Sequence, residues 1–188
     1  TVKHDQSADF KLIEELNGAE EVFDACAGKP FIGFRVFAEK QVIGVSLCIS
    51  ETEIYLVPVQ GLVTEGYLLG KLSDLILQKS DTVFVTFHLK EQLKYLNQAA
   101  DMRLAGERIF DAAIAAYLLN PLKNDYEIED VAGEYAGLMI PDRAQAFGKL
   151  SLERAFEEKP AEFLNYACFY SYVCFQAYAG LKSRLNET

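Results

Sequence analysis

Basic residues are scarce in this chain of 188 residues. It has 18 Lys and Arg against 28 Asp and Glu, which gives a formal net charge of −10. A domain that binds nucleic acid by itself usually presents a basic face, because its affinity comes from neutralising phosphates. The basic residues here are scattered along the sequence and form no cluster. The charge balance therefore argues against tight binding of DNA or RNA by this chain alone.

Long apolar runs are also missing. No run approaches the roughly 18 residues that a membrane-spanning helix needs. Residues 1–15 are polar and acidic, unlike a secretory signal peptide. We therefore expect a soluble, cytoplasmic protein with no membrane partner.

Cysteine and histidine are too few and too dispersed for a zinc site. The two histidines are His4 and His88, and no two cysteines form a CxxC pair. This spacing argues against a Cys/His zinc centre, and nothing else in the sequence indicates a cofactor. Reduced, buried thiols are the expectation at Cys26, Cys48, Cys168 and Cys174.

Apolar residues are plentiful, at 51% of the chain, which is enough for one domain with a sizeable core. We expect a polar lead-in over residues 1–28 that holds one helix, at about 19–27. Short apolar runs separated by short gaps predict antiparallel strands at 31–37, 42–49 and 54–59. The later apolar spacing predicts helices at 65–78, 89–100 and 112–119, strands at 82–87 and within 102–110, and a surface loop at 141–150. This order indicates an α/β fold with a mixed sheet, flanked by helices, in which an antiparallel meander is extended by βα units.

The last predicted helix, residues 161–185, is apolar around most of its circumference. Such a helix is buried on more than one side. A central core helix is the favoured interpretation. Contact of Phe169, Tyr172 and Phe175 with a second domain is the alternative.

Residues 109–121, with the sequence IFDAAIAAYLLNP, resemble a stretch of the 3′–5′ exonuclease domain of bacterial DNA polymerase I. The resemblance extends to the first hairpin and third strand, to residues 83–93 and to Tyr166-Ala167, and covers about residues 29–185. It implies one domain over 29–188, with the ribonuclease H-like fold of the DnaQ-like exonuclease type. It also implies that the domain was excised from a larger polymerase.

The family's chemistry rests on four carboxylates that hold two divalent metal ions about 3.5–4 Å apart. The resemblance places Arg35 and Phe37 at the first two carboxylate positions, Gln92 at the third and Tyr170 at the fourth. Mg²⁺ prefers oxygen ligands, and the carboxylates also supply the negative charge. The substitutions therefore imply a lost site with no catalytic residue and no bound metal, filled by a partly aromatic plug. Alternation along residues 31–37 places Phe37 on the face that carries Arg35, where we expect it to pack toward Tyr170.

Three other residues have both a functional and a structural interpretation. Tyr166 keeps its family identity and would orient the attacking water, but without metals we expect it to pack on its helix and hydrogen bond locally. His88 suggests a base or ligand, but a surface or capping role is favoured. Asp111 suggests a surviving ligand, but its place before residues 112–119 favours an N-cap.

The sequence therefore predicts an inactive exonuclease-like domain that is a structural module of a DNA polymerase used in replication and repair. Its partner would be the polymerase domain of the same parent chain, and DNA would be contacted only through that parent. Two alternatives remain. One is an active 3′–5′ exonuclease with unconventional ligands, and the other is a protein- or nucleotide-binding module that reuses the closed cleft.

Overall fold

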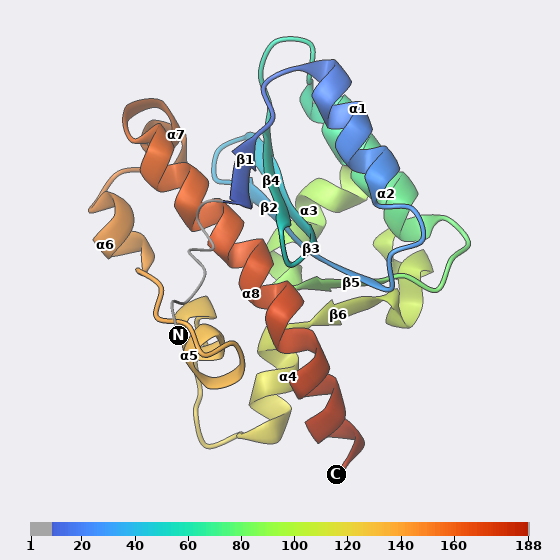
Figure 1. The fold of residues 1–188 in the computed structure, drawn as a ribbon, viewed down its shortest axis with the longest axis vertical. Coiled ribbons are helices and arrows are strands. Elements are labelled where there is room, and N and C mark those ends of the chain that lie inside the picture. The colour runs from blue at the N-terminus through green and yellow to red at the C-terminus, as the bar shows by residue number, and fades with distance from the viewer. Residues whose placement is uncertain (1–8, 188) are drawn as a thin grey trace.

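The computed structural model describes residues 9–187, which build a six-stranded mixed sheet covered by helices on both faces (Figure 1). The sheet order is β1-β4-β3-β2-β5-β6. The meander of β2, β3 and β4 is antiparallel, while β1, β5 and β6 join it in parallel. The strands are β1 (Phe10–Leu12), β2 (Phe31–Ala38), β3 (Val42–Ser50), β4 (Glu53–Pro58), β5 (Val83–Thr86) and β6 (Ile109–Asp111). This is the mixed α/β architecture that the sequence predicts.

Two helical layers bury the two faces of the sheet in separate cores. One layer comprises α1 (Leu16–Ala25), α2 (Glu65–Leu77) and α3 (Leu89–Ala99). The other comprises α4 (Ala112–Leu119), α5 (Ile128–Tyr135), α6 (Arg143–Phe147), α7 (Leu152–Glu158) and α8 (Pro160–Asn186). None of the helices within residues 9–187 is long and apolar enough to cross a membrane.

Helix α8 crosses the sheet and is the central helix of its layer, as the sequence predicts (Figure 1). Gly33 on β2 makes the close approach possible, because a Cβ at this position would clash with the carbonyl oxygen of Ser171. The same region holds a buried 2.6 Å hydrogen bond between the hydroxyls of Ser46 and Ser171. The side chains proposed for a second domain are packed internally instead. Tyr172 is buried, and the rings of Phe169 and Phe175 pack on Phe10 and Phe31.

The structure differs from the sequence prediction in several segments, including the unpredicted helices α5 and α7. Residues Met102–Arg108 form 3₁₀ turns interrupted by the positive φ of Gly106, and only Ile109–Asp111 is extended. The loop expected at 141–150 contains α6. Strand β1 was not predicted, and it shows that the described part of the segment before residue 29 adds both a strand and a helix to this fold.

Candidate functional site

The four substituted positions come together beside a cleft of about 480 Å³ at the end of β2. Three of these positions line the cleft, Arg35 and Phe37 on β2 and Tyr170 on α8. Tyr166, also on α8, lines it beside them. Gln92 projects from α3 and is buried, with 1% of its surface exposed. Residues that are distant in the sequence therefore meet at one place, where the resemblance locates the exonuclease centre.

The guanidinium of Arg35 donates hydrogen bonds to Phe87, Tyr170 and Glu91. Its Nη1 donates to the carbonyl oxygen of Phe87 at 2.6 Å and to the hydroxyl of Tyr170 at 3.2 Å. Its Nη2 forms a 3.1 Å ion pair with Glu91, whose side chain is 62% exposed. Burial acts to lower the pKa of Arg35, but Tyr170 and Glu91 outweigh that effect and the pKa is raised. The guanidinium therefore remains a fixed positive charge at the end of β2.

The carbonyl oxygen of Phe87 is the shared acceptor of this network. Besides Arg35, it accepts from Nε2 of Gln92 at 3.1 Å and from the hydroxyl of Tyr170 at 3.3 Å. Oε1 of Gln92 in turn accepts the backbone N–H of Val36 at 2.9 Å. Three of the substituted residues thus join β2, α3 and α8 through one carbonyl group.

Phe37 supplies the apolar part of the site. Its ring lies 5.7 Å from the ring of Tyr170, 5.8 Å from Phe163 and 6.0 Å from Tyr166, measured between centroids. Phe37 is 3% exposed and therefore packs toward Tyr170 as its alternation predicts. Burial raises the pKa of both tyrosines, although nearby Arg35 opposes the shift. Both hydroxyls therefore stay protonated near neutral pH.

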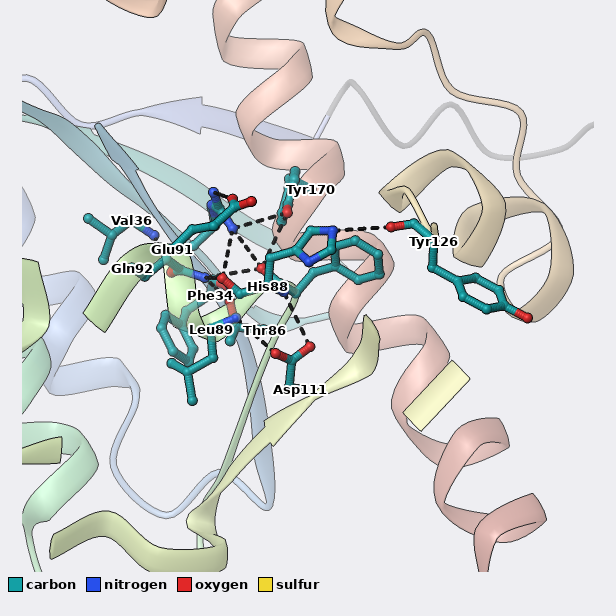
Figure 2. Close-up of polar contacts among 12 residues, drawn as sticks. Phe34, Val36, Thr86, His88, Leu89, Glu91, Gln92, Asp111, Tyr126 and Tyr170 are labelled. Carbon is teal, nitrogen blue, oxygen red and sulfur yellow. Dashed lines mark hydrogen bonds and ion pairs between the residues drawn. The ribbon is translucent and has the colours of Figure 1, made fainter. Parts of the chain in front are cut away.

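Asp111 is the N-cap of α4, as the sequence predicts, and it also binds the start of α3 (Figure 2). Its Oδ1 accepts the N–H groups of Ala113 at 2.9 Å and Ile114 at 3.4 Å. The same carboxylate accepts from His88 N at 3.2 Å and Leu89 N at 2.9 Å. One acidic side chain thus satisfies unpaired N–H groups at two helix starts.

His88 departs from the predicted surface or capping role. Its backbone occupies the N-cap position of α3 with a positive φ of 57°, but its side chain makes no cap hydrogen bond. The half-buried ring instead places Nε2 3.1 Å from the carbonyl oxygen of Tyr126. His88 therefore ties the segment before α5 to the end of β5.

The rim of the cleft carries charged side chains whose position at the site the sequence does not predict. Asp125, Glu127 and Glu129 line it, together with Arg143, which pairs with Glu39. The three acids lie just before or within α5, a helix that was not predicted, and Arg143 follows it on α6. The capping-box pattern of Glu127 and Asp130 was the available signal for that helix.

The side chains at the four substituted positions do not fit a two-metal site. None is a carboxylate, and Arg35 brings a positive charge against incoming cations. Two of the acids that line the cleft are already paired, Glu91 with Arg35 and Glu39 with Arg143. Within residues 9–187, no cluster of three or more His, Cys, Asp or Glu side chains could hold a metal ion.

Several solved nuclease structures are similar to this chain in the arrangement of strands and helices. The EXO domain of Aedes aegypti Nibbler matches with a TM-score of 0.65 at 12% identity, over 94% of this chain and 88% of that one. Escherichia coli RNase D, an exoribonuclease involved in structured RNA processing, matches with a TM-score of 0.68 at 15% identity. The catalytic core of Trypanosoma brucei RRP6 matches with a TM-score of 0.69 at 13% identity.

The chain has the fold of the DnaQ-like 3′–5′ exonuclease domains. The match to RNase D includes 95% of this chain but only 45% of RNase D. The match to RRP6 includes 94% of this chain but only 47% of the RRP6 structure. At these identities the likeness establishes the fold alone. Neither a protein-family model nor a curated protein sequence matches the chain.

Proposed function

We propose that this chain is a catalytically inactive 3′–5′ exonuclease-like domain that acts as a structural module. The observation that carries the proposal is the environment of Arg35. A guanidinium that is 15% exposed, paired with Glu91 and bonded to Phe87 and Tyr170, stands where the resemblance requires a metal-binding carboxylate. The positive charge of Arg35 would repel the two divalent metal ions that the family's reaction needs.

The substituted residues support a structural role, because each adds contacts between elements. An active site of four acids carries like-charge repulsion that bound metals must relieve. Here Arg35, Gln92 and Tyr170 share one acceptor, and Phe37 packs in an aromatic cluster. The domain would thus keep its shape without any bound ion.

We further infer a DNA polymerase I type parent in the cytoplasm, with its polymerase domain as the partner and with DNA contacted only through it. The support is the sequence likeness of residues 109–121 and of the flanking segments to that family. The test is whether the open reading frame continues into a polymerase domain. A continuation into a different enzyme would contradict the parent while leaving the inactive domain intact.

Inactivity is tested with end-labelled single-stranded DNA and RNA in Mg²⁺ or Mn²⁺. We expect no 3′-to-5′ shortening above a mock preparation. Metal-dependent shortening that is lost in a Glu91→Gln variant would instead support an active enzyme with unconventional ligands. A variant with Arg35→Asp, Phe37→Glu, Gln92→Asp and Tyr170→Asp tests the residue assignments separately, because it should gain thermal stability from Mn²⁺ that the native chain does not.

A further inference from the structure

A second groove, of about 550 Å³, lies beside the cleft and is used by nothing described so far. It runs between the first turn of α3, the outer side of α4 and the segment that leads to α5. Its apolar walls are Ala113, Ile114 and the rings of Tyr117 and Tyr126, with Lys90 and Asn124 at its edge. A volume of this size and a mainly apolar lining are typical of small-molecule sites.

Helix α4 is built to leave this wall uncovered. Its small side chains face inward, since Ala112, Ala113, Ala115 and Ala116 are all buried. Its large apolar side chains face outward, with Ile114 59% exposed, Leu118 61% and Tyr117 47%. Large exposed apolar side chains beside a groove indicate a binding surface rather than ordinary surface variation.

The polar groups at the groove divide into those already engaged and those available. Asp111 accepts four backbone N–H groups, Glu91 pairs with Arg35, and the His88 ring is bonded to Tyr126. Among residues 9–187, the Lys90 ammonium and the Asn124 amide have no side-chain hydrogen bond or ion pair. The groups left for a ligand are therefore one cation, one amide and aromatic or aliphatic walls.

We propose that this groove binds a small aromatic carboxylate, with its flat ring between Ile114 and Tyr117 and its anion beside Lys90. The ring matches the apolar walls, and a single negative charge matches the single unpaired cation. A polyanion such as nucleic acid fits poorly, because the chain carries a net charge of −10. This inference does not depend on the loss of nuclease activity in the neighbouring cleft.

The probe is indole-3-propionate, added to the isotope-labelled chain while backbone amide shifts are recorded. We expect saturable shifts centred on Ile114, Tyr117 and Asn124, with a Kd on the order of 1 mM for so small a ligand. Two matched probes separate the contribution of the aromatic ring to binding from that of the carboxylate. Indole-3-ethanol keeps the ring without the charge and should bind about fivefold more weakly, and butyrate keeps the charge without the ring and should not bind measurably.

Substitutions at two exposed residues of the groove, compared with two control substitutions elsewhere on the surface, locate the site. Ile114→Asp should abolish the shifts, and Lys90→Met should weaken indole-3-propionate about fivefold without changing indole-3-ethanol. The controls are Leu62→Asp, at a 78% exposed apolar residue between β4 and α2, and Lys79→Met, after α2. Shifts centred on Arg35, equal binding of the charged and neutral indoles, no saturable binding, or equal effects of test and control variants would each overturn the proposal.

Discussion

Arg35 places a positive charge where the resemblance expects a carboxylate, and its neighbours supply acceptors for that charge. The guanidinium has a carbonyl oxygen, a hydroxyl and a carboxylate as partners. Its Nε is buried and has no hydrogen-bond partner among the described residues. Such an incompletely satisfied group costs stability, so the network at Nη1 and Nη2 must offset that cost. Arg35 is therefore better placed for holding elements together than for binding a ligand.

Phe37→Glu is expected to destabilise the domain by about 2–4 kcal/mol, because it buries an unpaired acid and removes aromatic contacts. Thermal and denaturant unfolding measure the change. Arg35, on the same face of β2, moderates the loss if its guanidinium reaches the new carboxylate. The control is Phe37→Leu, which keeps the site apolar and should cost about 1–2 kcal/mol. A Phe37→Glu variant that unfolds like the native chain would show that the plug does not depend on this ring.

The four cysteines are expected to be unreactive while the chain is folded. Burial raises the pKa of Cys26 from 9.0 to about 12, and burial also raises the pKa values of Cys48, Cys168 and Cys174. A thiol-specific reagent at pH 8 should therefore modify them only after denaturation.

The same shift predicts how stability depends on pH. The folded state favours the protonated thiol of Cys26, so its contribution is complete below pH 9 and is lost progressively as the pH rises toward 12. Denaturant titrations across this range should show the loss, and Cys26→Ala should reduce it. Rapid modification of the native chain at pH 8, or stability that rises above pH 9, would contradict this assignment.

At the scale of elements, Asp111 joins the starts of α3 and α4. Asp111→Ala should cost about 2–3 kcal/mol, because unpaired N–H groups are left at two helix starts. Thr64 is the matched control, since its side chain caps only α2 through Tyr67 N, and Thr64→Ala should cost about 1 kcal/mol. Hydrogen exchange should accelerate at His88 and Leu89 only in the Asp111 variant. Equal costs for the two variants would show that the link to α3 contributes nothing.

The sequence predicted the elements whose apolar pattern is long. The β2–β4 meander and helices α2, α3, α4 and α8 all appear within a few residues of their expected ends. Strand β1 is three residues long, which is too short to show a recognisable alternation of apolar and polar residues. Helices α6 and α7 are also short, although Asp142 and Ser151 carry visible capping signals.

The candidate site was only partly accessible from the sequence. The resemblance predicts the carboxylate positions, and the residues at those positions lie on β2, α3 and α8 and meet at one place. The alternation of β2 also predicts the direction of Phe37. The shared carbonyl of Phe87 could not be foreseen, because a backbone acceptor has no signature in side-chain identity. The rim acids and the groove beside α4 were missed for a related reason, since both depend on how the segment between α4 and α6 folds back.

At the scale of the whole molecule, the net charge of −10 predicts weak or absent DNA binding by the isolated chain. Few phosphates can be neutralised, so little counterion release is available to drive binding. Fluorescence anisotropy with labelled single strands at low and moderate salt tests this, and no saturation is expected at micromolar concentrations. Micromolar affinity that falls steeply with salt would reveal a basic groove and favour the binding-module alternative.

The short strand β1 protects one edge of the sheet. Its residues Phe10, Lys11 and Leu12 pair in parallel with Ile54, Tyr55 and Leu56 of β4. A chain shortened to begin at residue 29 would leave the backbone N–H and C=O groups of β4 open along a strongly apolar strand. Open edges of this kind recruit further strands from other molecules. The consequence is practical, because fragments cut at that boundary should aggregate and lose solubility, while fragments that retain β1 should remain dispersed.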